Sequence, residues 1–115
     1  MKLHRWNEIP VEQLNPLVTR QAVHSDQMTI ARLGLKKGAI VPRHHHVNEQ
    51  VTNLEQGRLR FVFDDGDLVV TAGDSLQIPS NVPHSVEALE DSVAVDLFCP
   101  VREDWLRGDD AYLRR

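Results

Sequence analysis

Hydrophobic and polar residues alternate with a period of two over much of the chain. In residues 58–63, Leu59, Phe61 and Phe63 alternate with two arginines and a valine. This spacing predicts a strand with one buried face, because successive side chains of a strand point to opposite sides. Comparable extended segments occur at residues 20–24, 28–35, 39–46, 49–54, 68–72, 75–79, 84–89 and 93–98. The pattern therefore predicts an all-β protein.

Short turns separate these segments. The Asp-Gly pair within residues 64–67 predicts a hairpin, since this pair suits the positive φ angles of a type I′ turn. Only residues 102–108 predict a helical turn, which ends at Gly108. Many short strands with close turns are typical of a β-sandwich or β-barrel.

The composition fits one compact domain over residues 1–115, with the barrel core at roughly 28–99. The length of 115 residues, with 41% hydrophobic and 26% charged residues, is ordinary for a single globular domain. A net charge of -4 gives no reason to expect nucleic acid as a partner. No segment approaches the roughly 18 apolar residues of a membrane span, and no secretory signal is evident. Cys99 is the only cysteine, which fits a cytoplasmic location.

Three consecutive histidines and one distant histidine predict a metal site. His44 and His46 share one face of an extended segment, with Cα atoms roughly 6.6 Å apart, while His45 faces away. Gln50 has the same parity, and His84 approaches from a distant, proline-flanked segment. We therefore predict His44, His46, Gln50 and His84 as the ligands. Isolated histidines at positions 4 and 24, like His45, are interpreted as ordinary side chains.

This ligand set has a chemical consequence. Three neutral imidazoles and one amide leave the charge of a divalent cation uncompensated, so the ion would be a strong Lewis acid and would favour an anionic ligand. A nitrogen-rich site suits several divalent transition metals, namely Ni, Zn, Fe, Mn, Co and Cu, and affinity alone does not select one.

Two motifs in the chain resemble those of the cupin superfamily. In "GAIVPRHHHVNEQVTNLEQG" the first signature falls on Gly38, His44, His46, Gln50 and Gly57, and in "GDSLQIPSNVPH" the second falls on Gly73, Pro79 and His84. Asn81 stands where a glycine is usual, and asparagine also tolerates the left-handed conformation. The resemblance implies a single-domain jelly-roll β-barrel with one metal ion inside its mouth.

A narrower resemblance extends over more of the chain. The opening "IPVEQLNPLVTRQAVHSDQMTIARLGLKKGA", the core "HHHVNEQVT" and the tail "PVREDWLRGDDAYLRR" resemble the pectin-degradation branch of small cupins, which linearises 4,5-unsaturated uronates. That branch implies catalytic roles for an aspartate, a phenylalanine and an arginine, which match Asp96, Phe98 and Arg102. Asn53 departs from the branch, where an aromatic residue is frequent, but its parity is opposite to that of the metal ligands.

The residues themselves support a special role for Asp96 and leave alternatives open. Asp96 lies on an otherwise apolar strand face with Ala94 and Phe98. An unpaired charge there is costly, so Asp96 is either functional or paired with an arginine such as Arg32 or Arg60. Arg102 is either a carboxylate ligand or a surface residue of the helical turn. Four further apolar residues are interpreted as core or interface, namely Met28, Leu59, Phe61 and Trp105.

These observations lead to one functional hypothesis and two rivals. The protein is expected to be a metal-dependent enzyme, an isomerase that linearises a small acidic sugar derivative, with Asp96 moving the proton, Arg102 holding the carboxylate and Phe98 shaping the pocket. The rivals are a metal-dependent dioxygenase and a non-catalytic module that binds a small ligand. A homodimer is also expected, with Val51, Asn53 and Val62 as candidate contacts, because exposed sheet faces and edges need covering.

Overall fold

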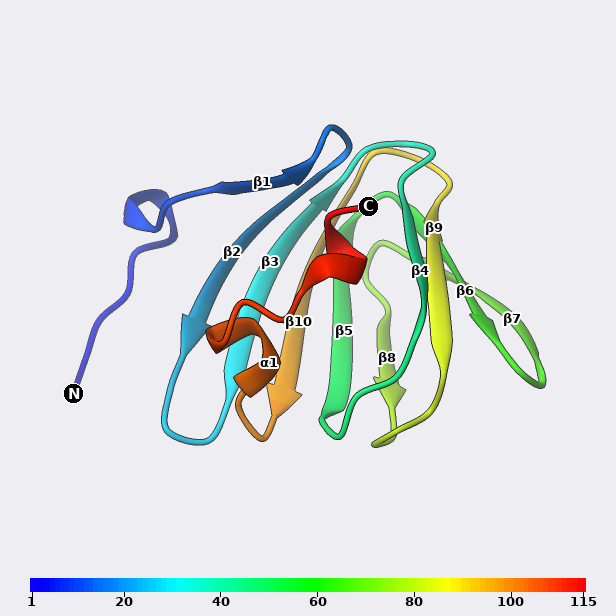
Figure 1. The fold of residues 1–115 in the computed structure, drawn as a ribbon. Coiled ribbons are helices and arrows are strands. Elements are labelled where there is room, and N and C mark those ends of the chain that lie inside the picture. The colour runs from blue at the N-terminus through cyan, green and yellow to red at the C-terminus, as the bar shows by residue number, and fades with distance from the viewer.

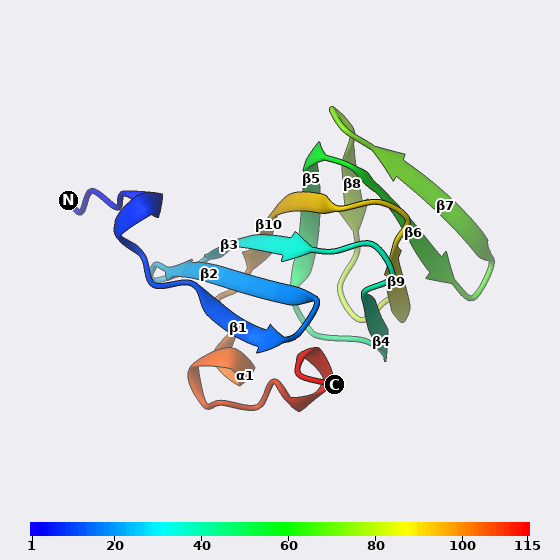
Figure 2. The same ribbon diagram turned by 90° about the horizontal axis from the view of Figure 1, so that it is seen from above.

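Ten strands form two antiparallel sheets that face each other, in a computed structural model that describes all residues from 1 to 115 (Figures 1 and 2). The six-stranded sheet has the order β1 (Glu12–Asn15), β2 (Val18–His24), β3 (Thr29–Leu35), β10 (Ser92–Cys99), β5 (Glu49–Gln56) and β8 (Ser75–Ile78). The four-stranded sheet has the order β4 (Ile40–His44), β9 (His84–Ala88), β6 (Arg58–Phe63) and β7 (Gly66–Thr71). The all-β prediction is confirmed.

The core lies between the two sheets and is built by the alternation seen in the sequence. In β3 every second residue is buried, and in β6 the buried positions are Leu59 and Phe61. Trp105, from the C-terminal part of the chain, joins the same core. The interpretation of these three residues as core is confirmed, whereas Met28 is exposed beside the β2–β3 turn and is not part of the core.

The predicted hairpin at residues 64–67 is present, but its predicted turn type is wrong. Phe63 pairs with Gly66, so the turn consists of Asp64 and Asp65, and neither has a positive φ angle. A type I′ turn needs positive φ at both central residues. Gly66 instead carries the positive φ, at 139°. Asn81 does adopt the left-handed conformation expected of it, with φ 62°.

Helical structure is limited to short turns. These are η1 (Trp6–Glu8), α1 (Glu103–Leu106) and η2 (Ala111–Leu113). None of them is long and apolar enough to cross a bilayer. The helical turn expected at residues 102–108 is therefore present as α1, whereas β1, η1 and η2 were not predicted.

Residues 102–115, here called the C-terminal segment, lie across one end of the barrel. Figure 1 shows this segment in front of the six-stranded sheet, with its end close to β4. Leu113 is buried in the core, and Asn15 donates hydrogen bonds to the backbone carbonyls of Leu113 and Arg115 at 3.1 Å. A buried ion pair between Arg20 and Asp110, at 2.8 Å, fastens the same segment to β2. These contacts position the C-terminal segment over the mouth of the barrel.

Candidate metal centre

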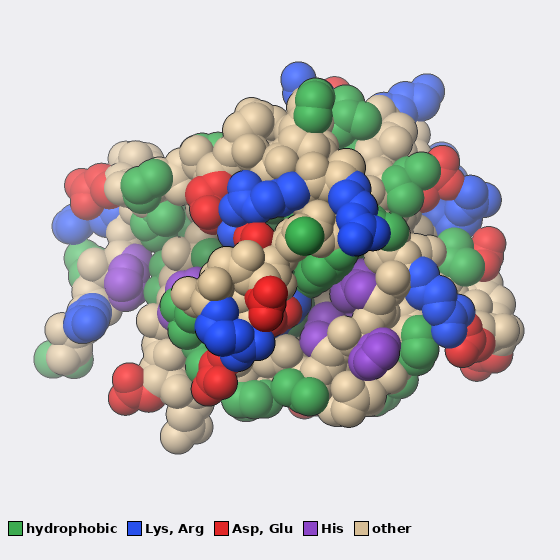
Figure 3. All heavy atoms as spheres, viewed as in Figure 1, with side chains coloured by type: hydrophobic (Ala, Val, Ile, Leu, Met, Phe, Trp, Pro, Cys, Tyr) green, Lys and Arg blue, Asp and Glu red, His purple; other side chains and the backbone are tan.

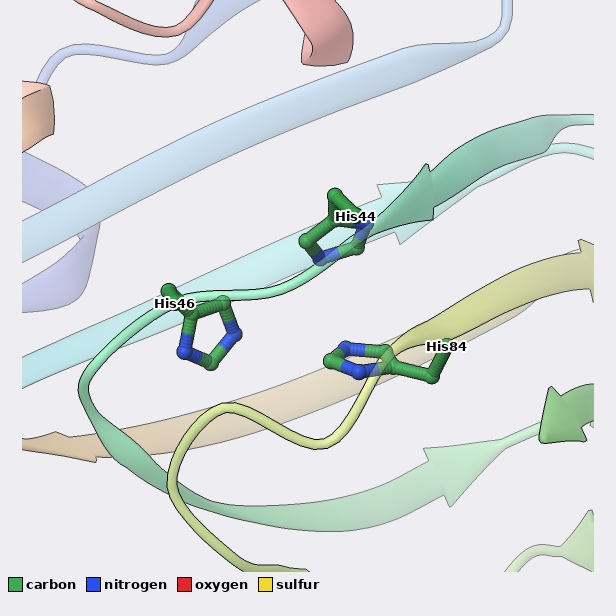
Figure 4. A group of neighbouring side chains, drawn as sticks. All are labelled: His44, His46 and His84. Atoms are coloured by element: carbon green, nitrogen blue, oxygen red, sulfur yellow. The ribbon is translucent and has the colours of Figure 1, made fainter. Parts of the chain in front are cut away.

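Three histidines from two chain segments converge inside the barrel mouth (Figure 4). His44 ends β4 and pairs in register with His84, which begins β9, while His46 lies in the loop that follows β4. One ring nitrogen of each lies within 4.8 Å of the others. His45 is exposed, as expected. His46 was predicted as a ligand from strand alternation. Because β4 ends at His44, it is instead the bend of the following loop that brings His46 to the site.

The hydrogen bonds of the three imidazoles leave one nitrogen of each free to bind a metal ion. In every ring Nδ1 faces a backbone carbonyl, that of Pro42 for His44, Asn48 for His46 and Val82 for His84, at 2.8, 3.0 and 2.8 Å. A carbonyl only accepts, so Nδ1 carries the proton and Nε2 carries the lone pair. Such bonds fix the tautomer and ring orientation of metal ligands.

Burial keeps these imidazoles neutral. Desolvation lowers the pKa of His44 to about 4, and it also lowers the pKa of His46 to about 4, where the positive charge of Arg102 acts in the same direction. The pKa of His84 is lowered as well, again chiefly by burial. At neutral pH all three rings are therefore unprotonated, which is the form that coordinates a metal ion.

Gln50 is buried in β5 and presents its side-chain oxygen to the same point. Its Nε2 donates to the Thr52 hydroxyl at 2.9 Å, so its Oε1 is the atom that lies 3.1 Å from His46 Nε2. With Nδ1 of His46 protonated, both facing atoms are acceptors and form no hydrogen bond with each other. A cation between them resolves this conflict. The donor set of three Nε2 atoms and one amide oxygen thus fits a divalent transition metal ion.

Asp96 is buried in the middle of β10, directly across from Thr52 of β5. Its Oδ1 is buried and has no hydrogen-bond partner. Burial raises the pKa of Asp96 to about 7, although the Thr52 hydroxyl and the charge of Arg102 act in the opposite direction. The carboxyl group therefore exchanges its proton near neutral pH, which suits a general acid or base.

The alternative of a structural ion pair for Asp96 is not borne out with either named partner. Arg32 pairs with Glu55 at 2.9 Å, and Arg60 pairs with Glu87. All four of those side chains lie toward the outside of the barrel, where they are partly exposed.

Arg102 is a buried residue, so its interpretation as a surface residue is wrong. Only 1% of its side chain is exposed, and its guanidinium lies over the rings of Phe98 and Trp105, at 4.7 and 4.3 Å from the ring centroids. Nε and Nη2 donate to the two carboxylate oxygens of Asp104 at 3.0 and 2.8 Å, and Nη2 also donates to the Tyr112 hydroxyl at 2.6 Å. Nη1 makes no hydrogen bond with the protein. Phe98 also packs edge-on against His46.

A cavity of about 40 Å³ joins most of these groups. Its polar lining consists of His44, Gln50, Thr52, His84, Asp96, Arg102 and Tyr112. The aromatic residues Phe61, Phe98 and Trp105 and core aliphatic residues complete its wall. His46 instead borders an outer depression of about 410 Å³, together with His45 and residues 103, 104 and 107. In the space-filling view, histidine side chains line a hollow on the same face of the molecule (Figure 3).

Three residues of this region were not predicted from the sequence. Thr52 shares strand parity with Gln50, and that signal was sufficient to find it. The Tyr112 ring packs against the His44 ring, with centroids 4.6 Å apart and the planes tilted by 30°, and Asp104 forms an ion pair with Arg102. Neither has a local sequence signal, because each reaches the site only through the course of the C-terminal segment.

The fold and the histidine cluster agree with the protein family whose sequence model matches this chain. The model of the cupin domain matches residues 31–100, and the chain belongs to that family. The two sheets are accordingly a jelly-roll barrel.

Three similar proteins illustrate the range within the family. A 3-hydroxyanthranilate 3,4-dioxygenase of Pyricularia oryzae is 27% identical in an alignment 103 residues long, which covers 84% of this chain but 54% of the relative. The chain thus spans about half the length of that curated relative. KdgF from Halomonas sp. is 25% identical with a TM-score of 0.79, over 86% of this chain and 94% of that one. An RmlC-like cupin from Shewanella frigidimarina is also 25% identical, with a TM-score of 0.84, over 91% and 96%.

Proposed function

We propose that the protein is a metal-dependent enzyme that linearises a 4,5-unsaturated uronate to its open-chain keto form. The observation that carries the proposal is the buried Asp96, whose Oδ1 is unpaired in the same cavity as two of the histidines, Gln50 and Arg102. A titratable group with a perturbed pKa in a cleft is a candidate for acid–base work.

The reaction needs protons to move and no oxidant. Removing the proton from the C1 hydroxyl forms a carbonyl at C1 as the bond between C1 and the ring oxygen breaks, and the former ring oxygen is left as an enolate on C5. The enolate becomes a ketone at C5 when a proton is added to C4, the other carbon of the double bond. With a pKa of about 7, Asp96 accepts the first proton and donates the second.

The remaining groups bind and orient the substrate. A metal ion held by the three Nε2 atoms and Gln50 would withdraw charge from an oxygen bound to it. Arg102 is the cation available to a carboxylate, and Phe98 holds the guanidinium on one side while it packs against His46 on the other. The apolar lining excludes water from the enol.

Two similarities are consistent with this choice of substrate. The motif of Asp96, Phe98 and Arg102 resembles the uronate-linearising branch, and the similarity to KdgF is consistent with that branch. The shared fold by itself carries no function.

The test is turnover of unsaturated galacturonate. It is measured as the loss of absorbance that occurs when the carbon–carbon double bond disappears. We expect turnover by the protein as purified, loss of turnover after chelation, and recovery when one of the candidate divalent metals is added back. No absorbance change with any of these metals would contradict the proposed function.

A dioxygenase is the second candidate, because the curated relative named above is a dioxygenase that acts on 3-hydroxyanthranilate. Iron-loaded protein would then consume oxygen when 3-hydroxyanthranilate is added. Ligand binding without either activity would instead support a binding module.

A further inference from the structure

An ion pair of the C-terminal segment separates the inner cavity from the outer depression. Arg102 lines the inner cavity, and Asp104 lines the outer depression. The Arg102 side chain is 1% exposed, whereas that of Asp104 is 27% exposed. A ligand that approaches from solvent therefore meets the carboxylate of Asp104 before it meets the guanidinium behind it.

The inner cavity is too small for a sugar acid in this conformation. A volume of about 40 Å³ holds roughly three water molecules. Sites for small organic ligands are usually about 300–1,000 Å³. The outer depression, at about 410 Å³, is within that range. A ligand that reaches both His44 and His46 must therefore open the boundary between the two spaces.

Neither edge of Arg102 offers two free N–H groups to a carboxylate, because Nη2 donates to both Asp104 and Tyr112. Nε and Nη2 make two parallel bonds with Asp104, at 3.0 and 2.8 Å, which is the bidentate geometry by which arginine recognises carboxylates. Asp104 thus occupies the position that a ligand carboxylate would take.

We propose that Asp104 determines specificity at this site by competing with the ligand's carboxylate for Arg102, so that a carboxylate ligand enters by exchanging places with Asp104. This rests on the proposed function in one respect, the assignment of Arg102 to the substrate carboxylate.

The exchange selects against neutral ligands. When one carboxylate replaces another, Arg102 keeps two charge-assisted hydrogen bonds. A neutral sugar that displaced Asp104 would leave the buried guanidinium without an anion, which is strongly unfavourable. The released Asp104 is already partly exposed and can be hydrated.

Competition within the chain weakens the apparent affinity for carboxylates. The apparent dissociation constant equals the intrinsic one divided by the fraction of molecules in which Arg102 is free. Weakening the internal competitor must therefore tighten binding. If Asp104 instead had a purely structural role and held Arg102 in place for the ligand, weakening it would make the ligand bind less tightly.

The experiment uses the fluorescence of Trp105, which follows Asp104 in the chain and lies 4.3 Å from the Arg102 guanidinium. Trp6→Phe removes the other tryptophan. The metal-loaded protein is titrated with galacturonate, which lacks the reactive double bond, and with galactose, which lacks the carboxylate. We expect Asp104→Asn to bind galacturonate about tenfold more tightly or better, in proportion to the competition removed, and galactose to bind neither protein.

Asp67→Asn is the matched control, because Asp67 is an exposed acid of β7 that lines neither the inner cavity nor the outer depression. It should leave galacturonate binding unchanged. Weaker or unchanged binding by Asp104→Asn, or no binding of galacturonate to either protein, would overturn the inference.

A second measurement uses the unsubstituted protein and does not depend on the folding of a variant. Galacturonate should increase hydrogen exchange in residues 103–109, because their ion pair to Arg102 opens, whereas a purely structural role predicts greater protection. Neither readout requires catalysis, so tighter binding without turnover would contradict the proposed function and leave this inference standing. Turnover by the parent together with weaker galacturonate binding by Asp104→Asn would support the proposed function and contradict this inference.

Discussion

The polar side chains of Gln50, Thr52 and Asp96 form a short sequence of contacts across two neighbouring strands. Gln50 donates to Thr52, and the Thr52 hydroxyl lowers the pKa of Asp96 against the effect of burial. The Thr52 hydroxyl accepts from Gln50, which leaves its own proton available to Asp96 when that carboxylate is ionised. The amide oxygen of Gln50 is then left for the metal. One threonine thus couples the orientation of a metal ligand to the acid–base residue.

Replacing Asp96 with asparagine should reduce turnover of unsaturated galacturonate by about 10²–10⁴-fold, the usual contribution of a positioned acid or base. The amide has nearly the same shape, so metal content and the melting curve in the holo form should be retained. Activity per bound metal is the measurement. Unchanged activity in Asp96→Asn would show that the aspartate is structural.

The stability of the metal-free protein should report the ionisation of Asp96. The folded-state pKa of about 7 is above the model value of 3.8, so the folded state binds the proton more tightly and stability falls as pH rises from about 4 to about 7. Between pH 5 and pH 8 the parent should lose on the order of 2 kcal/mol relative to Asp96→Asn. Denaturant unfolding of both proteins at both pH values measures this difference.

Ionisation of the three histidines changes stability with pH in the opposite direction. Comparing the parent with Asp96→Asn removes this effect. Folding lowers the pKa of all three, so their stabilisation is lost as pH falls below about 6.5, in the range from about 6.5 to about 4 for His44 and His46. Both proteins share this loss. An equal pH dependence in the two proteins would contradict the raised pKa of Asp96.

At the scale of elements, the metal site joins both sheets. His44 and His84 come from neighbouring strands of the four-stranded sheet, Gln50 comes from β5 of the six-stranded sheet, and His46 comes from the loop between them. A bound ion therefore cross-links β4, β5 and β9 at one end of the barrel.

Metal binding should raise the melting temperature for this reason. A ligand at 100 times its dissociation constant adds about 2.7 kcal/mol to the free energy of unfolding. Thermal melting with and without chelator measures the effect, and His84→Ala should abolish the difference. His45→Ala, which changes an exposed histidine in the same run, should keep both the metal and the difference. Equal melting curves in the parent, with no metal in protein prepared without chelator, would contradict the site.

At the scale of the whole molecule, the outer face of the six-stranded sheet carries one apolar row. Four aliphatic residues, Val23, Ile30, Leu97 and Val51, pair across β2, β3, β10 and β5 in one row. An antiparallel sheet with a solvated face normally carries polar residues there. A second copy of the chain related by a twofold axis would cover the same row on both copies.

We therefore expect a homodimer, measured by light scattering as a mass twice that of the chain. Leu97→Lys, in the middle of the row, should shift the protein toward the monomer. Val51 and Asn53 lie on this outer face, whereas Val62 lies on the outside of the other sheet, in β6. A single flat interface on the six-stranded sheet can therefore include Val51 and Asn53 but not Val62. A monomer mass at all concentrations would contradict the dimer.

The sequence by itself determined the features that depend on a period of two and on residue chemistry. Alternation assigned Leu59, Phe61 and Gln50 to the inside, because a strand has only two faces. It also placed Asp96 on an apolar face, where an unpaired carboxyl group needs a role. The nitrogen-rich ligand set could be listed before any geometry was known.

Only the tertiary structure decided which distant groups meet. His46 reaches the site through a loop, Arg102 is buried by residues 103–115 and bound to Asp104, and Tyr112 packs on His44. The path of the C-terminal segment depends on its packing against β1, β2 and β4. The local pattern of polar and apolar residues in that segment does not indicate these contacts. The size of the cavity depends on the same packing, because the segment that supplies Arg102 also covers the mouth of the barrel.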